Sequence, residues 1–202
     1  MTKGEVTRQK IIEKAAPLFN QLGYAGCSMQ DIMAATGLEK GGLYRHFSSK
    51  EELAEESFRY SLARVMGARW QGTEEIEGSL EKLRSLVRGF VGIHSIIPGG
   101  CPVLNTAIDA DDGNPALRKL VQRAVQEWKA RIAGIVTVGI ERGEIRSDIE
   151  PRSIANILIA ALEGALMISR LEGNRSAVHD AQAMLDKVLI DIRSAAPPLD
   201  SV

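Results

Sequence analysis

The chain has 202 residues, of which 45% are hydrophobic and 4% aromatic, and its net charge is −1. This length allows one large domain or two small ones, with a core built mainly from Leu, Ile, Val and Ala. Two cysteines and three scattered histidines, without a Cys-x-x-Cys pair, exclude a disulfide framework and argue against a structural metal site. We therefore expect neither a metal nor a cofactor.

Charge and hydropathy also vary along the chain. Residues 1–70 carry 10 Lys and Arg against 8 Asp and Glu, whereas residues 71–202 carry 15 against 18. Any affinity for DNA must therefore come from local placement of charge rather than from a basic arm. The N-terminus has no apolar signal segment, and the most apolar run, Ile157 to Ile168, is short and contains Glu163. These features predict a soluble cytoplasmic protein with no membrane partner.

The first predicted element is a helix over about residues 6–22. Its apolar positions recur at helical spacing, Pro17 interrupts the pattern and Gly23 ends it. A second, shorter helix begins after a capping box formed by Ser28 and Asp31 and ends at Gly37. The apolar face of the first helix comprises Ile12, Ala15, Ala16, Phe19 and Leu22.

The stretch from Gly37 to Leu53 then contains a turn and a short basic-aromatic helix, which completes a helix-turn-helix pattern. Leu43 and Phe47 lie one turn apart and are expected to face a core. The remaining side chains are cationic or can donate hydrogen bonds, which suits a DNA backbone and its major groove better than a packed protein surface. These outward residues are Lys40, Tyr44, Arg45, His46 and Lys50.

The rest of the chain also shows helical patterns and no strand pattern. Ser49 and Glu52 form a second capping box, from which a helix continues to about residue 70. Further helices are predicted over residues 79–97, 102–110, 114–143, 151–173 and 176–194, with the Pro98-Gly99-Gly100 run ending the first of these. Residues 195–202 contain Pro197-Pro198 and are predicted to be disordered. The predicted fold class is therefore all-α.

The region from about Arg8 to Phe58 resembles the DNA-binding domain of the TetR family of transcriptional regulators. It covers about the first quarter of the chain, and the remainder resembles that family only as an all-helical ligand-binding domain of suitable length. The resemblance implies a three-helix head over residues 1–50 and a helical effector-binding and dimerisation domain over 51–194, in which 51–70 is a linking helix. The residues that carry the resemblance are Phe19, Gly23, Tyr24, Ser28, Ile32, Gly37, Gly41, Leu43, Tyr44, Phe47, Ser49, Lys50, Glu51, Glu52 and Leu53.

The resemblance also implies roles for individual residues on DNA. Positions matching Ser28, Tyr44, His46 and Lys50 meet phosphates in the family. Positions matching Gln30, Lys40, Gly41 and Gly42 approach base edges, although Gly42 replaces the commoner threonine, serine or alanine. Arg45 occupies a variable family position, so its contact is open.

The effector pocket is predicted from polar or bulky residues in an otherwise aliphatic region. Gly100-Cys101-Pro102 also resembles one branch of the family, in which a Gly-Cys pair opens a short central helix. Cys101 has two readings: a buried small hydrophobe, or a reactive thiol activated by the helix that starts at Pro102. Cys27 is expected to be a core residue. The pocket candidates are His94, Cys101, Asn105, Trp128, Met167 and Arg170.

The last two helices carry long aliphatic stripes, and the apolar surface of helix 151–173 is wide enough for a second buried face. A homodimer built as a four-helix bundle would bury that face. The predicted interface residues are Ile154, Leu158, Leu162, Leu185, Val188 and Ile192.

The favoured function is a sequence-specific DNA-binding regulator, a repressor that a small molecule or electrophile releases from its operator; activation stays open. One alternative is an enzyme that uses Cys101 as nucleophile with His94 or Asp109, but no carboxylate pair, phosphate loop or metal cluster accompanies it. Another is an effector-free architectural DNA-binding protein. The prediction is therefore a non-enzymatic homodimer whose partners are double-stranded operator DNA and an unidentified effector.

Overall fold

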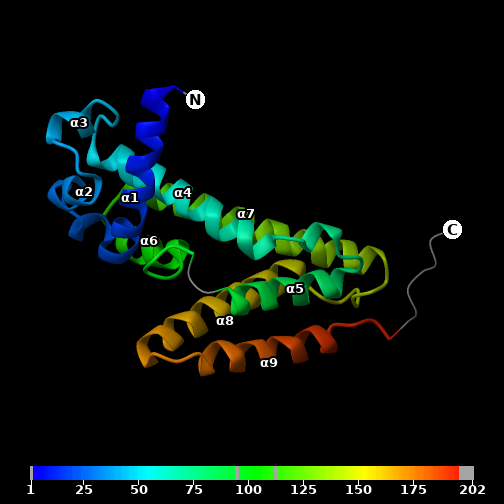
Figure 1. Cartoon of the computed structure of the whole chain (residues 1–202). Helices are drawn as coiled ribbons and strands as arrows, with labels where there is room; N and C mark the ends of the chain where they lie inside the picture. Colours follow the sequence, from blue (N-terminus) through cyan, green and yellow to red (C-terminus); the bar gives the residue numbers. More distant parts are fainter. Residues whose placement is uncertain (1, 94–95, 112, 196–202) are drawn as a thin grey trace. The chain divides into compact units, whose positions relative to one another are not determined.

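The computed structural model describes residues 2–93, 96–111 and 113–195, and 78% of these residues are helical. Nine α-helices occupy these ranges without a strand, as the sequence predicts (Figure 1). An isolated antiparallel bridge joins Ile145 to Arg193. The chain forms two compact units: unit 1 comprises residues 1–66 and 95–125, and unit 2 comprises 67–94 and 126–202. The predicted domain boundary after residue 50 stays a prediction.

Unit 1 begins with α1 (Lys3–Gly26), which starts three residues earlier than predicted because Thr2 and Glu5 form a capping box. Its helical backbone is interrupted at Gly23, where φ is +74°, so the predicted stop signal holds. Next come α2 (Met29–Thr36), α3 (Lys40–Tyr44) and α4 (Lys50–Trp70). The chain then passes through a segment of unit 2 and returns to unit 1 with α6 (Pro102–Ala110) and the first part of α7 (Pro115–Glu141). Helix α6 packs on α1.

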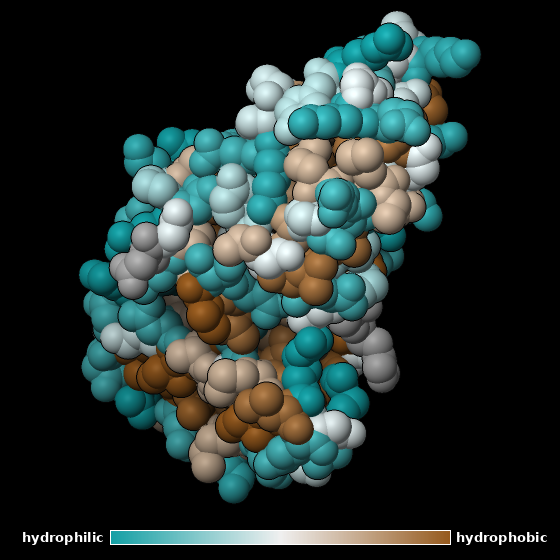
Figure 2. Space-filling model, turned by 90° about the vertical axis from the view of Figure 1, so that its left-hand side faces the viewer, coloured by the Kyte–Doolittle hydropathy of each residue, from teal (hydrophilic) through white to brown (hydrophobic). Residues whose placement is uncertain are grey.

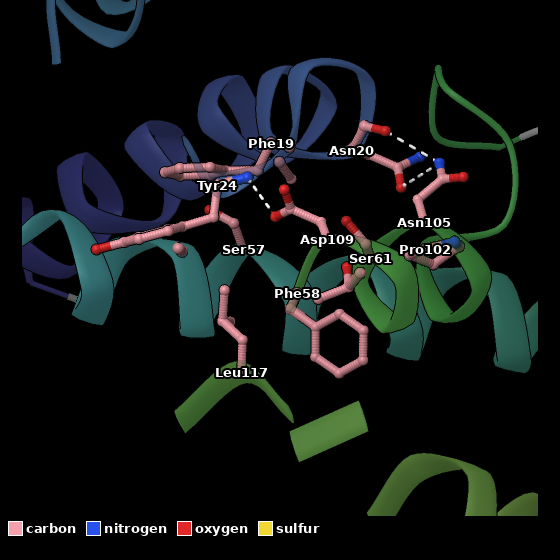
Figure 3. A pocket seen from close by; sticks show the side chains of 14 residues that line it. Phe19, Asn20, Tyr24, Ser57, Phe58, Ser61, Pro102, Asn105, Asp109 and Leu117 are labelled. Carbon is pink, nitrogen blue, oxygen red and sulfur yellow. Dashed lines mark hydrogen bonds between the residues drawn. The ribbon is translucent and has the colours of Figure 1, made fainter. Parts of the chain in front are cut away.

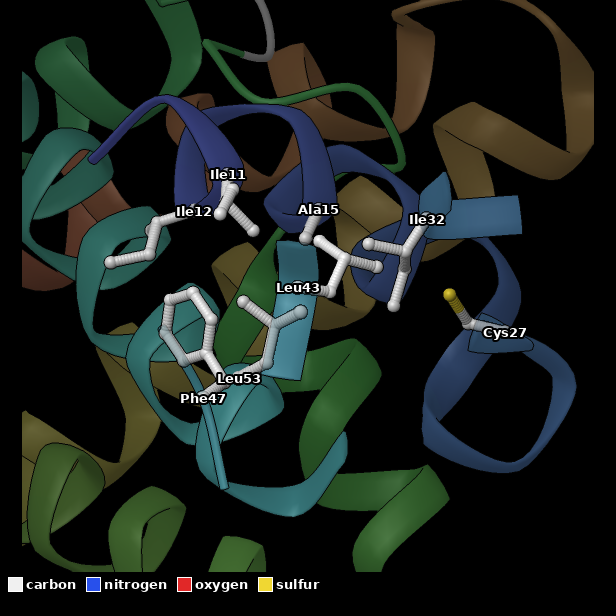
Figure 4. Packing of buried hydrophobic residues seen from close by; sticks show 8 residues of the cluster. All are labelled: Ile11, Ile12, Ala15, Cys27, Ile32, Leu43, Phe47 and Leu53. Carbon is white, nitrogen blue, oxygen red and sulfur yellow. The ribbon is translucent and has the colours of Figure 1, made fainter. Parts of the chain in front are cut away.

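A continuous apolar core holds the first helices of unit 1 together (Figure 4). Leu43 of α3 and Phe47, which follows the end of that helix at Tyr44, are both buried in this core, as predicted. The buried thiol of Cys27 lies in the same core, as expected, and its pKa is raised by burial and by Asp31, with Lys50 acting in the opposite direction. The core comprises Ile11, Ile12, Ala15, Cys27, Ile32, Leu43, Phe47 and Leu53.

Unit 2 is a helical bundle in which α8 (Pro151–Glu172) and α9 (Ser176–Asp191) lie side by side (Figure 1). Helix α5 (Ser79–Gly92) packs against both. The predicted end of α5 near Ile97 is wrong: the helix ends at glycine 92, a poor helix former, and Ile93 is extended. By length and composition α8 could cross a membrane, but core helices of soluble proteins have the same composition, so this is weak evidence.

Candidate nucleic-acid interface and cavities

The turn between α2 and α3 forms as the sequence predicts. Ser28 caps α2: its hydroxyl accepts from the Asp31 amide at 3.2 Å, and the Asp31 carboxylate accepts from the Ser28 amide at 2.7 Å. Gly37 ends the helix in the left-handed conformation, with φ of +69°. Hydrogen bonds from the hydroxyl and amide of Ser28 lower the pKa of Asp31, so this cap is strongest when Asp31 is ionised.

Helix α3 presents one polar face because its apolar side chains are buried. Lys40, Gly41, Tyr44 and Arg45 are exposed, whereas His46 is half-buried. The ammonium of Lys40 lies 6.0 Å from the centre of the Tyr44 ring. The surface made by Lys40, Tyr44 and Arg45, here called the α3 face, thus offers two cations and a phenol on a helix backed by a rigid core, which suits phosphate and base contacts in a major groove.

Other predicted DNA contacts lie around this face. Gln30 is exposed and Gly42 is half-buried. The hydroxyl of Ser28 donates to Asp31 at 2.6 Å, so a phosphate contact would have to replace that bond. Lys50 opens α4, and its ammonium lies 4.4 Å from the centre of the Tyr24 ring. Tyr24 therefore helps to hold Lys50, a positioning role that the sequence patterns did not reveal.

The start of α4 differs in one detail from the predicted capping box. The Ser49 hydroxyl accepts from the Glu52 amide at 3.1 Å, as predicted. The Glu52 carboxylate, however, accepts from the amide and hydroxyl of Ser48, at 2.7 and 2.8 Å. The guanidinium of Arg8 also pairs with Glu52 and lies over the Phe47 ring. These contacts tie α1 to the start of α4 within unit 1.

A small cavity of about 20 Å³ lies between α1, α4 and α6 in unit 1 (Figure 3). Its walls are held by side-chain amides. Asn105 donates to the backbone oxygen of Asn20 at 3.0 Å and to that of Gly99 at 2.8 Å, and Asn20 donates to the backbone oxygens of Pro98 and Gly100. Asn105, predicted as a pocket residue, therefore lines a cavity, but its side-chain amide already donates to α1 and to the loop that precedes α6.

Unit 2 contains an aromatic site, here called the inner site, that is already filled by protein side chains. The Arg69 guanidinium lies 3.9 Å from the centre of the Phe90 ring and 3.4 Å from a carboxylate oxygen of Glu163. Phe90 and Trp128 stack with ring centres 6.3 Å apart. The side chains of Arg69 and Glu163 are both buried. Removing either one would leave the other as an uncompensated buried charge, which is strongly destabilising. The space left around these side chains is only about 20 Å³.

The six predicted pocket residues are thus distributed over several places. Trp128 lines the inner site of unit 2, whereas Asn105 lines the cavity of unit 1. Cys101 is buried at the start of α6, Met167 and Arg170 are exposed on α8, and His94 lies outside the described residues. Arg69 and Glu163 were missed, although the interruption of an apolar run by Glu163 was a visible signal.

The predicted dimer interface stays a prediction, because the structure contains a single chain. Five of the six, all except the half-buried Val188, are buried within this single chain, so they belong to its own core and are not available to a partner as they lie. Apolar periodicity marks a buried face without telling which partner buries it. Figure 2 shows exposed apolar patches on one face of the molecule. The exposed apolar residues of α8 and α9 are Ile157, Met167, Ile168, Leu171, Met184 and Ile190.

Comparisons with known proteins agree with these features. Residues 11–57 match the family model described as bacterial regulatory proteins, tetR family, and residues 79–185 match the model of the tetracyclin repressor-like C-terminal domain. The chain is 28% identical to the HTH-type transcriptional repressor DhaR of Mycobacterium sp. strain GP1, covering 91% of this chain and 92% of that protein.

Solved structures extend the similarity to the whole fold. A TetR transcriptional regulator from Chloroflexus aurantiacus is 40% identical with a TM-score of 0.92, over 96% of this chain and 100% of that chain. A TetR-family regulator from Cytophaga hutchinsonii is 34% identical with a TM-score of 0.89, over 98% and 99% of the two chains.

Proposed function

The chain belongs to the TetR family of transcriptional regulators, and from this premise we propose that it is a dimeric repressor that a small-molecule effector releases from its operator. Its DNA-binding part is the N-terminal helix-turn-helix. Members of this family are regulators rather than enzymes, and the comparisons support neither a cysteine-dependent enzyme nor an architectural protein. We place its action in the cytoplasm, where operator DNA is accessible to it.

The α3 face is the observation that carries the DNA-binding role. Burial of Leu43 and Phe47 fixes the helix, so Lys40, Tyr44 and Arg45 are held outward on a rigid support. Lys50, at the start of α4, adds a further cation next to Tyr24. Positions around this face are proposed to meet phosphates through Ser28, Tyr44, His46 and Lys50, and base edges through Gln30, Lys40, Gly41 and Gly42, with Arg45 open to either contact.

Dimerisation is proposed through the exposed side chains of α8 and α9. Leu171 is 81% exposed and Met184 59% exposed, which is unfavourable for large apolar groups that gather on neighbouring helices. A second copy that packs the same helices against them would bury these groups and would place two α3 faces on a near-palindromic site.

Effector binding is proposed to take place in unit 2. A ligand that binds one conformation of the dimer better than the DNA-competent one shifts the population toward it and lowers DNA affinity. The hypothesis that the effector is an electrophile that modifies Cys101 is less favoured, because this residue is only 2% exposed.

The experiment is a binding titration on the DNA that flanks the protein's own gene, because regulators of this kind often control their neighbours. Fluorescence anisotropy should give saturable binding that resists excess non-specific competitor and weakens with salt. Equal affinity for scrambled DNA would refute sequence-specific regulation.

A further inference from the structure

A second cavity of unit 2, here called the outer groove, has more room than the inner site. Its cavity volume is about 310 Å³, compared with about 20 Å³ for the inner site. A drug-sized ligand needs roughly 300–1,000 Å³. The groove is formed by the end of α4, the turn that follows it, the start of α5 and the second half of α7. Its lining residues are Trp70, Thr73, Glu74, Gly78, Ser79, Lys82, Arg131, Gly134, Ile135, Val138 and Arg142.

The outer groove is cationic. Three basic side chains line it, Lys82, Arg131 and Arg142, against one carboxylate, Glu74. Glu74 is already paired with Arg131, and within the described ranges neither Lys82 nor Arg142 pairs with a carboxylate. Two positive charges are thus left for a ligand, whereas the whole chain is close to neutral, with a net charge of −1. Charge complementarity therefore favours an anion.

The same groove has an apolar wall. The guanidinium of Arg131 stacks 3.7 Å from the centre of the Trp70 ring, and Ile135 and Val138 line the groove from α7. Thr73, which also lines it, has a buried hydroxyl with no hydrogen-bond partner among the described residues. A ligand with an apolar body would cover the wall, and a polar group on it could reach the hydroxyl.

The anionic group of such a ligand has a defined place. The first amide of α5, on Ser79, already donates to the carboxylate of Glu144 at 2.5 Å, so the start of that helix is occupied. An incoming anion would also be repelled by Glu144. The available cations are then Lys82, in the first turns of α5, and Arg142, just after α7.

We infer that the outer groove binds an amphiphilic organic anion, whose apolar body lies against Trp70, Ile135 and Val138 and whose anionic group is held by Lys82 and Arg142. This inference deepens the proposed function by naming the chemical class of the effector, and only its regulatory consequence rests on that function. Trp70 lines the inner site as well as the outer groove, and it is the last residue of α4. A ligand on Trp70 therefore contacts the helix whose first residue is Lys50.

The binding test uses tryptophan fluorescence of the full chain. The chain has two tryptophans, so Trp128→Phe leaves Trp70 as the single reporter at the groove. This variant is titrated with decanoate at pH 8, and with decanol and decyltrimethylammonium as neutral and cationic analogues of the same chain length. We expect saturable change of Trp70 emission with decanoate, and at least about tenfold weaker binding of both analogues.

Charge variants then locate the anion. Lys82→Gln with Arg142→Gln should weaken decanoate binding about tenfold. The matched control removes two positive charges elsewhere in unit 2, Arg152→Gln with Lys187→Gln, and should change the affinity less than twofold; circular dichroism checks that both proteins are folded. Equal binding of decanol, unchanged affinity in the groove variant, or an equal loss in the control would overturn the inference.

Binding of operator DNA is measured separately, so the two claims fail independently. Specific operator binding without any decanoate binding at Trp70 would overturn the groove and leave the proposed function intact. Decanoate binding that depends on Lys82 and Arg142, in a protein that shows no specific DNA binding, would support the groove and contradict the proposed function.

Discussion

The carboxylate of Asp109 on α6 accepts a hydrogen bond from the backbone amide of Tyr24 at 2.6 Å, directly after the break in α1 (Figure 3). Gly23 makes this contact possible: a Cβ atom there would lie 2.6 Å from the carboxylate, and its φ is +74°. The Tyr24 ring in turn supports the ammonium of Lys50. Within unit 1, one residue thus connects α6 to a predicted phosphate contact.

Removing either side of this connection should destabilise unit 1. Asp109→Ala leaves the partly buried Tyr24 amide without its partner and should cost about 1–3 kcal/mol. Gly23→Ala introduces a side chain at positive φ and a clash with Asp109, and should cost at least about 1–2 kcal/mol. Urea unfolding of each variant measures the loss.

The double variant is the control for direct coupling. Because Asp109→Ala removes the atoms with which the new methyl group collides, the combined loss should be smaller than the sum by about 0.5–3 kcal/mol. Strictly additive losses would mean that the contact between these two residues does not exist in solution.

Lys50→Ala should weaken binding to specific and non-specific DNA alike, and should lower the slope of log affinity against log salt by about one unit, because one phosphate contact is lost. Tyr44→Ala should also weaken binding to all sequences. Anisotropy titrations at several salt concentrations measure both effects. Wild-type affinity and slope in both variants would remove this surface from the DNA interface.

Acid should weaken the start of α4 through Glu52. Hydrogen bonds from the amide and hydroxyl of Ser48, together with Arg8, lower the pKa of Glu52 from its ordinary value of 4.5. A lowered pKa in the folded state means that the carboxylate stabilises the fold above pH 4.5, and that this contribution is lost as the pH falls through the lowered value. Between pH 7 and pH 3, the midpoint temperature of thermal unfolding should therefore fall less steeply in Glu52→Gln than in the wild-type protein. Identical pH profiles would exclude the effect.

The two cysteines should be unreactive in the native protein. Cys27 is fully buried and burial raises its thiol pKa, and Cys101 is also buried. A thiol-reactive chromogenic disulfide should modify neither thiol rapidly under native conditions and both in denaturant. Rapid modification of a thiol that disappears in Cys101→Ser would restore the electrophile-sensor hypothesis.

Dimerisation should depend on exposed rather than buried apolar residues. Leu171→Glu should shift the protein toward monomers that keep native helicity, because its side chain is 81% exposed in the single chain. Leu158→Glu places an unpaired charge in the core of the subunit and should abolish folding instead. Sedimentation and circular dichroism separate the two outcomes; an intact dimer with Leu171→Glu would place the interface elsewhere.

The sequence predicted what depends on local signals. Capping at Ser28, the left-handed Gly37 and the spacing of Leu43 and Phe47 are set by near neighbours, so the DNA-binding head followed from them. The end of α5 could not be predicted from local signals, because the helical apolar pattern of the sequence continues beyond glycine 92, where the backbone becomes extended.

Contacts between distant residues were beyond such reasoning. Arg69 and Glu163 are 94 positions apart, and nothing in either local pattern indicates that they pair beside Phe90. The same limit explains the dimer residues: α8 is apolar on two faces, and only the packed subunit shows that Leu158 is internal while Ile157 is exposed.

The most direct test of the central claim is hydroxyl-radical footprinting of the DNA that flanks the protein's own gene. The wild-type protein should protect two patches separated by one helical turn, about 10–10.5 base pairs, or a multiple of it, as expected for two α3 faces in a dimer. The variant Lys40→Ala with Arg45→Ala, which keeps Leu43 and Phe47 in the core, should lose both patches. Protection that survives unchanged in this folded variant would contradict the assignment of α3 as the DNA-reading helix.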